Sequence, residues 1–215
     1  MREHDDEPVR GLPERLPDGE RLIWQGAPDW RVMAVRVFHV RLVAAYFLAM
    51  MAWRATAASA AGASLAEATG QLLGPLIGAG LTLALLCGLS VLMARTTVYT
   101  ITSKRLVLRF GVAIQKAINI PFAIVHSAAV KAHRDGGGDI ALTLGRQNVI
   151  AYPMLWPHVR PWKLTPAQPA LRALANVHAV AALLTDAIRA HAPQTIVASA
   201  TTSAGDAPVG APVAA

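Results

Sequence analysis

The stretch "RTTVYTITSKRLVLRFG", Arg95 to Gly111, decides the fold of this 215-residue chain. Apolar and polar side chains alternate on both sides of its central "TSK", a pattern typical of two antiparallel strands joined by a tight turn. A run of 22 residues without a charge, Leu72 to Met93, ends almost directly before it. The sequence therefore predicts a β-hairpin that begins where a membrane-spanning helix ends.

The composition agrees with a chain that lies partly in lipid. Hydrophobic residues make up 54% and charged residues 15% of the sequence, and the mean hydropathy is +0.40. Soluble domains carry about 25% charged residues. The net charge of +7 favours an acidic or anionic partner. A single cysteine, Cys87, excludes a disulfide within the chain, and the first thirty residues show no signal-peptide pattern.

Two apolar runs predict a transmembrane hairpin with helices at about residues 37–57 and 72–93. The first run, Val37 to Trp53, rises about 25 Å as a helix, which is short for a hydrocarbon core of about 30 Å. Arg36, His39 and Arg41 flank one end and can reach the headgroups. An amphipathic or buried core helix stays open as an alternative for this first run.

Lysine and arginine are distributed unevenly around this hairpin. Seven precede or include Arg41, twelve follow Met93, and Arg54 alone lies between the runs. The positive-inside rule then places both termini in the cytoplasm. We expect a multi-pass protein of a bacterial inner or intracytoplasmic membrane.

After the hairpin, short strand candidates are separated by turn signals and followed by one amphipathic helix. The helix is expected over Asn176–Ala190, with Asn176 as N-cap and an apolar stripe of Val177, Val180, Ala181, Leu184 and Ile188. This predicts an α+β membrane protein in which a small antiparallel β-sandwich or barrel, capped by a C-terminal helix, follows the hairpin. The expected segments are 1–34, the cytoplasmic N-terminal segment; 35–94, the hairpin; 95–191, the cytoplasmic domain; and 192–215, a disordered tail. Further strand candidates are Ala113–Ile120, Ile124–His133, Ile140–Leu144 and Val149–Leu155.

Small residues recur at helical spacing in the second apolar run. Such spacing lets two helix backbones approach closely. The face could pack against the first helix of the hairpin, or against a partner or a second copy of the chain. The residues are Gly74, Gly78, Gly80, Ala84 and Gly88.

Four cations follow the membrane exit closely in sequence: Lys104, Arg105, Arg109 and Lys116. Juxtamembrane cations are attracted to anionic lipid. We expect these residues to form a basic face towards the membrane surface, and a solvated positive face is the alternative.

The string "WPHVRPW", Trp156 to Trp162, cannot form a regular helix or strand because it contains two prolines. Exposed tryptophans are uncommon, so both could fold back as an aromatic clasp between sheet and helix. Alternatively, the segment forms a docking edge for a partner, with Arg160 as its charged anchor.

No catalytic constellation can be argued from the residues. His126 and His133 have no nearby carboxylate pattern, and "DGGGD", Asp135 to Asp139, lacks the lysine of a phosphate loop, so it reads as a hairpin turn. His39 is interpreted as an interfacial residue, with pigment or haem ligation as the alternative. We expect no enzyme, no cofactor, no metal and no nucleic-acid partner.

Longer strings resemble known families. "YTITSKRLVLRFG" resembles the hairpin of bacterial PH-like domains. Together, "GERLIWQGAPDWRVMAVRVFHVR", "AYFLAMMAWR", "TTVYTITSKRLVLRFGVAIQKAINIPF" and "LWPHVRPWKL" resemble the PuhB family of photosynthetic-complex assembly proteins of purple bacteria, over roughly residues 16–184.

The resemblance to that family implies an inner-membrane protein that aids assembly of the photosynthetic reaction centre with its core light-harvesting antenna. It also implies contact with reaction-centre subunits, the H subunit among the candidates, and self-association as a homodimer. The family brings no catalytic residues. The alternative is a general PH-like module at the membrane surface, which binds anionic lipid or an unrelated membrane protein.

Overall fold

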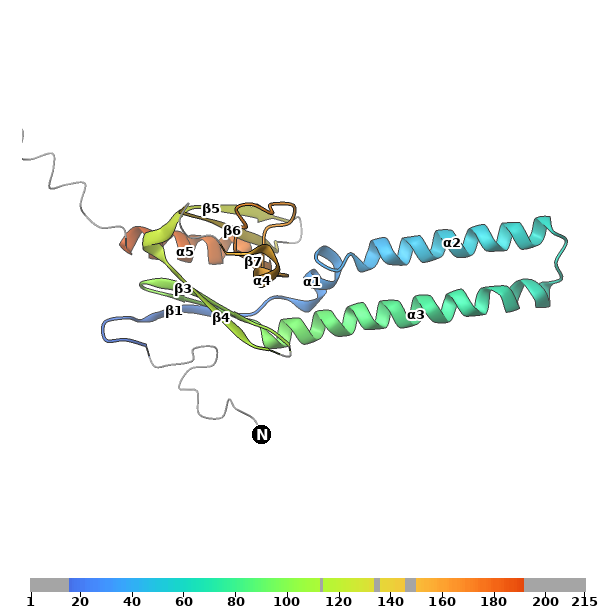
Figure 1. Cartoon of the computed structure of the whole chain (residues 1–215), viewed down its shortest axis with the longest axis horizontal. Coiled ribbons are helices and arrows are strands. Elements are labelled where there is room, and N and C mark those ends of the chain that lie inside the picture. The colour runs from blue at the N-terminus through green and yellow to red at the C-terminus, as the bar shows by residue number, and fades with distance from the viewer. Residues whose placement is uncertain (1–15, 113, 134–135, 146–149, 192–215) are drawn as a thin grey trace, which may run out of the picture.

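Two long antiparallel helices extend from one side of a β-rich domain (Figure 1). The computed structural model describes residues 16–112, 114–133, 136–145 and 150–191. A short helix, α1 (Trp30–Arg36), connects the domain to the first long helix. The long helices, here called the hairpin, are α2 (Val40–Ala60) and α3 (Leu65–Thr96).

The hairpin exposes apolar surface along nearly its whole length. Both helices are long and apolar enough to cross a membrane, and only 6% and 11% of their most apolar 18-residue windows are buried within the protein. The core helix of a soluble protein would be mostly buried, so these two helices are candidates for membrane spans. A capping box starts α3, since Ser64 accepts from the backbone N–H of Glu67 and the Glu67 side chain accepts from the backbone N–H of Ser64.

The domain consists of two antiparallel sheets that face each other. The first has the strand order β1-β2-β3-β4 and the second the order β5-β6-β7. The strands of the first sheet are β1 (Leu22–Gly26), β2 (Val98–Thr102), β3 (Arg105–Phe110) and β4 (Lys116–Pro121). Those of the second are β5 (Val125–Ala132), β6 (Gly138–Leu144) and β7 (Ala170–Leu174). Three short or capping helices complete the domain: η1 (Phe122–Ile124), α4 (Tyr152–Leu155) and α5 (Val177–His191).

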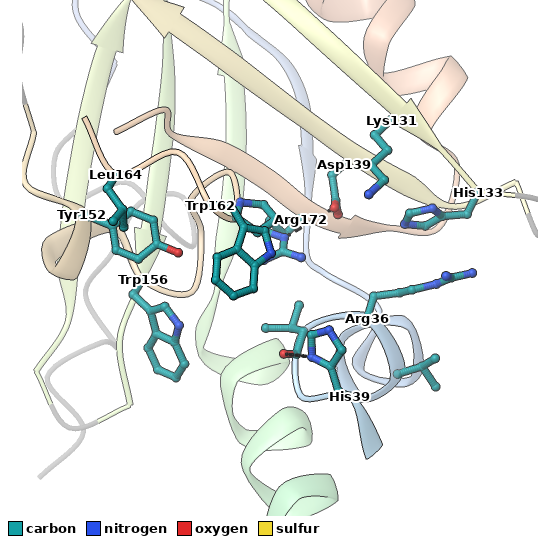
Figure 2. Close-up of a pocket in the computed structure, with 13 residues that line it drawn as sticks. Arg36, His39, Lys131, His133, Asp139, Tyr152, Trp156, Trp162, Leu164 and Arg172 are labelled. Atoms are coloured by element: carbon teal, nitrogen blue, oxygen red, sulfur yellow. Dashed lines mark hydrogen bonds and ion pairs between the residues drawn. The ribbon is translucent and has the colours of Figure 1, made fainter. Parts of the chain in front are cut away.

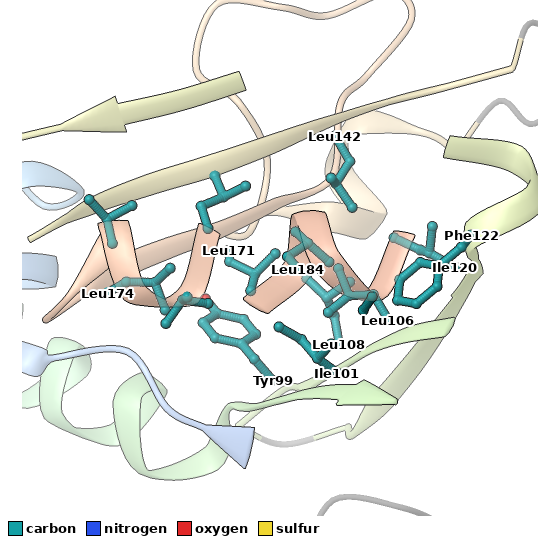
Figure 3. Close-up of a cluster of buried hydrophobic side chains, with 14 of the residues drawn as sticks. Tyr99, Ile101, Leu106, Leu108, Ile120, Phe122, Leu142, Leu171, Leu174 and Leu184 are labelled. Carbon is teal, nitrogen blue, oxygen red and sulfur yellow. The ribbon is translucent and has the colours of Figure 1, made fainter. Parts of the chain in front are cut away.

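Helix α5 lies between the sheets and closes the sandwich (Figure 3). Asn176 caps it, because its Oδ1 atom accepts from the backbone N–H of Ala179 at 3.3 Å. Val177, Val180 and Leu184 are buried against both sheets, as the predicted stripe requires. The other large core side chains include Tyr99, Ile101, Leu106, Leu108, Ile120, Ile140, Leu142, Leu171 and Leu174.

The predicted fold class is confirmed, with one change in how the domain is assembled. Strand β1 precedes the hairpin in sequence and pairs with β2, which follows it, so that Gly26 lies opposite Tyr99. The domain is therefore built from both sides of the hairpin, rather than from 95–191 alone. Both chain connections between domain and hairpin lie at the same end of the domain.

Two local predictions need correction. Within the strand candidate Val149–Leu155, residues Tyr152–Leu155 form the short helix α4, and Val149 lies outside the described residues. Strand β7 was not predicted from its sequence. Every residue of β7 is buried, so its side chains show no alternation of apolar and polar residues. The predicted tail, 192–215, and residues 1–15 lie outside the described residues.

Candidate functional site at the junction of hairpin and domain

A single residue, Thr97, separates helix α3 from strand β2. It is buried, and its hydroxyl lies 3.1 Å from Nε2 of His158. Nδ1 of His158 lies 2.7 Å from the hydroxyl of Tyr99, two residues into the strand. His158, the third residue of the string "WPHVRPW", therefore binds the point where the second long helix enters the sheet.

The hydroxyl of Tyr99 extends this network to strand β7. It donates to the carbonyl of Arg172 at 3.2 Å and accepts from the backbone N–H of Arg172 at 3.1 Å. All these groups are satisfied when His158 carries its proton on Nδ1 and accepts from Thr97 on Nε2. Burial, together with the nearby charge of Arg172, lowers the pKa of His158 to about 3. The imidazole is therefore neutral at physiological pH, and burial likewise raises the pKa of Tyr99.

Helix α1 holds the second connection between domain and hairpin, which runs from β1 to α2. The backbone N–H of Asp29 donates to the carbonyl of Ala173 in β7 at 2.7 Å, and the Asp29 carboxylate caps the helix by accepting from Arg31. The carbonyl of Trp30 accepts from the hydroxyl of Ser90 in α3 at 2.6 Å. Because α1 contacts both the sheet and α3, the domain is fastened to the hairpin at two separate places.

Beside this junction lies a cleft of about 560 Å³. Three segments that are distant in sequence form its walls: the joint between α1 and α2, the β5–β6 hairpin with β7, and the segment from α4 to Leu164. Figure 2 shows Tyr152, Trp156 and Trp162 on one side and polar side chains on the other. We call it the junction cleft. The residues on its polar side include Arg36, Lys131, His133 and Asp139.

The charges in the junction cleft do not cancel. Asp139 accepts from the backbone N–H of Ala173 at 2.9 Å and lies 3.5 Å from Nε of Arg172, so its charge is compensated. Arg36 and Lys131 are exposed, and neither has an ion-pair or hydrogen-bond partner for its side chain within the part of the chain that the structure describes. Since Asp139 is the only carboxylate among the lining residues, two positive charges remain uncompensated.

The two tryptophans of "WPHVRPW" do not form the expected aromatic clasp. Trp156 is 47% exposed and contacts Phe38 edge to face, and Trp162 is 96% exposed. Both line the junction cleft. Arg160 donates to Gln168 at 3.1 Å. It lines an adjoining hollow of about 230 Å³ and not the junction cleft, so Arg160 and Trp162 do not line the same hollow.

The four cations expected to form one basic face lie at two ends of the domain. Lys104 and Arg105 lie at the β2–β3 turn, which is the far end of β2 from α3, about 17 Å along a five-residue strand. Arg105 is paired with Glu20 at 2.8 Å. Arg109 lies opposite Val98 and Lys116 opposite Phe110, both at the hairpin end. The prediction of a single basic face is therefore corrected.

The small-residue face of α3 does not contact α2. A Cβ atom added to Gly74, Gly78, Gly80 or Gly88 would meet no atom within 4 Å. Ala84 is exposed as well. Packing of this face inside the hairpin is thereby excluded, and its contact with a partner remains a prediction.

Two further sequence interpretations can be placed in the structure. His39 is the N-cap residue of α2, with φ 53° and its Nδ1 atom 3.0 Å from the carbonyl of Val37, next to the junction cleft. "DGGGD" covers the β5–β6 turn and the first residues of β6, although Asp135 lies outside the described residues. The backbone N–H of His133 closes this turn by donating to the carbonyl of Gly137 at 2.7 Å. No group of three metal-ligating side chains occurs within the described ranges.

Comparison with known proteins agrees with this architecture. The model of the bacterial PH domain family matches residues 34–188, which include both long helices and most of the domain. A protein of Rhodobacter capsulatus, described as an uncharacterized 23.7 kDa protein in the puhA 5′ region, is 37% identical over 204 residues, which cover 92% of this chain and 95% of that protein. No solved structure matches the chain. On these findings, the chain belongs to the bacterial PH domain family.

Proposed function

We propose that this protein is a non-catalytic assembly factor for the photosynthetic reaction centre and its core antenna, and that it works by binding their subunits at the membrane. The observation that carries the proposal is the relative from the puhA 5′ region, a photosynthesis gene region, which is similar over nearly the whole chain. The resemblance to the PuhB family supports the same role.

In this proposal the hairpin crosses the inner membrane with both chain ends in the cytoplasm. The exposed small-residue face of α3, Gly74 to Gly88, offers a close-packing surface to a helix of an incoming subunit. The bonds of Thr97 and Ser90 hold the domain against the same helix. A subunit bound along α3 would therefore meet the domain at one fixed position on the cytoplasmic side.

The test is deletion of the gene in the native host, followed by near-infrared absorption spectra of its membranes. We expect reduced absorption from reaction centre and core antenna, restored by a copy of the gene supplied elsewhere. Absorption equal to that of the parent strain would refute the assembly role.

The contact surface can be tested in the same strain. Gly80→Leu combined with Ala84→Leu adds bulk to the small-residue face and should restore absorption poorly, because the partner helix can no longer approach. The matched control is Leu42→Phe with Leu48→Phe, which adds bulk at exposed positions of α2, away from the small-residue face of α3. Equal restoration by both pairs would exclude this face as the contact surface.

A further inference from the structure

We propose that the junction cleft binds the phosphate group of an anionic phospholipid from the membrane leaflet that borders the domain. This inference rests on the membrane placement of the hairpin in the proposed function, and it does not depend on the role in assembly. It assigns a ligand to Arg36, Lys131 and Trp162, which belong to three separate segments of the chain.

The position of the cleft along the hairpin matches the height of lipid headgroups. Val37 and His39, which line it, directly precede α2. The 21 residues of α2 rise about 32 Å, close to the hydrocarbon thickness of about 30 Å. When α2 spans the hydrocarbon, the cleft lies just outside it, where the phosphates are.

The charge of the cleft fits a phosphodiester. Arg172 is engaged with Asp139 at 3.5 Å, whereas Arg36 and Lys131 line the cleft from two different segments, the α1–α2 joint and β5, without a partner among the described residues. A phosphate between them would accept charge-assisted hydrogen bonds from both. The surface potential of an anionic leaflet adds to this attraction.

Further donors are available at the same place. Helix α2 begins without a side-chain cap and has no acidic residue in its first turn, so its first N–H groups favour an anion. Nε2 of His133, on the opposite wall, is buried without a hydrogen-bond partner within the described part of the chain. These donors would add to the binding of a phosphate by the two cations, and they would not bind it without the cations.

The rim of the cleft distinguishes a lipid from a soluble phosphate compound. Trp162 is 96% exposed, so its indole ring lies almost entirely in water, which is unfavourable for so large an apolar surface. Leu164, 66% exposed, and Trp156 lie beside it on the same wall. Tryptophan is favoured at the interface between headgroups and acyl chains. A lipid would occupy both parts of the cleft, while a free phosphate would occupy only the charged part.

The experiment measures lipid binding to the full-length protein, purified in detergent and stripped of lipid. Phosphatidylglycerol, phosphatidylcholine and inorganic phosphate are titrated separately, and bound ligand is counted by native mass spectrometry. We expect one tightly bound phosphatidylglycerol and at least about tenfold weaker binding of it by Arg36→Gln combined with Lys131→Gln. Equal binding of the two lipids would overturn the proposal.

The matched control is Lys104→Gln combined with Arg189→Gln, which removes the same charge from the β2–β3 turn and the end of α5, away from the hairpin. Circular dichroism establishes that both double variants are folded. The control should bind phosphatidylglycerol like the wild type, and an equal loss in the control would show that only net charge matters. Inorganic phosphate that binds as tightly as the lipid, or displaces it, would overturn the assignment to a lipid.

The two proposals fail separately. The Arg36/Lys131 variant is also returned to the deletion strain, and its near-infrared absorption is recorded. If the variant loses lipid binding but restores absorption, the lipid site is supported and assembly does not need it. Lipid binding with no effect of gene deletion on absorption would sustain the lipid site and refute the assembly role.

Discussion

The two ends of the PH-like domain contain similar side chains in opposite situations. At the end away from the hairpin, Arg105 is paired with Glu20, and the Thr102 hydroxyl accepts from the backbone N–H groups of Lys104 and Arg105. At the hairpin end, Arg36 faces a cleft without a partner in the described part of the chain, and Trp162 is almost fully exposed. At the far end, the charged and polar groups have partners within the chain. At the hairpin end, cations and an aromatic ring of the cleft have no such partner among the described residues, which is typical of a surface that binds another molecule.

The largest effect is expected from removing the buried polar group at the hairpin end. His158→Ala deletes two hydrogen bonds and leaves the hydroxyls of Thr97 and Tyr99 buried without their imidazole partner. We expect the free energy of unfolding to fall by about 3 kcal/mol, measured by denaturant unfolding of the purified protein.

His178→Ala is the control, since His178 is exposed on α5 and makes no such bonds among the described residues. It should change the free energy of unfolding by less than about 0.5 kcal/mol. If the two variants were equally stable, the Thr97–His158–Tyr99 network would not hold the junction together.

Acid should weaken the same junction gradually. Burial lowers the pKa of His158 to about 3 from its usual 6.5, so between these values the unfolded chain binds a proton that the folded chain does not. Its contribution to stability is complete above pH 6.5 and is lost as the pH falls towards 3, by at most about 1.4 kcal/mol per pH unit.

The measurement compares unfolding free energies of the wild type and His158→Asn from pH 7 to pH 4. Other titrating groups are common to both proteins, so the difference isolates His158. The variant should lose less stability than the wild type over this range. Parallel pH profiles would mean that His158 is not kept neutral by the fold.

A smaller effect is expected at the far end of the domain. Arg105→Gln removes the partner of the Glu20 carboxylate, whose side chain is only 3% exposed. A largely buried carboxylate without its partner should lower the free energy of unfolding by about 1 kcal/mol. Lys104→Gln, at the adjacent exposed position, should have almost no effect in the same unfolding measurement. A larger loss of stability from Lys104→Gln than from Arg105→Gln would contradict the pairing of Glu20 with Arg105.

The sequence predicts those parts of the fold that depend on neighbours in the chain. The β2–β3 hairpin and helix α5 with its Asn176 cap follow from local alternation and period, and both are present. Strand β1 contains the short apolar segment Leu22–Trp24, but its pairing with β2 joins residues about 75 positions apart. Periodicity contains no information on such a partner.

The junction cleft was harder to predict for the same reason. Its walls come from three separate segments, and no motif links Arg36 with Lys131. The prolines and tryptophans of "WPHVRPW" mark it as unusual in sequence, but its buried polar side chain is His158, which no local pattern distinguishes. One local signal was available and missed: the pattern Ser64-x-x-Glu67 marks the start of α3 well before the apolar run.

The smallest effect on stability, and the one that sharpens the comparison most, is expected from Trp162→Ser. Because Trp162 is 96% exposed, its removal should change the free energy of unfolding in detergent by less than about 0.5 kcal/mol. In bilayers whose acyl chains carry bromine near the headgroups, the wild-type tryptophan emission should be quenched more than that of the variant. Trp24 packs against the core of the domain, so Trp24→Phe removes an unquenched emitter and should raise the quenched fraction. Trp162→Ser that left the quenched fraction unchanged would place this ring in water. The exposed tryptophan would then be an unfavourable group without compensation, and the hairpin end of the domain would not meet the lipid.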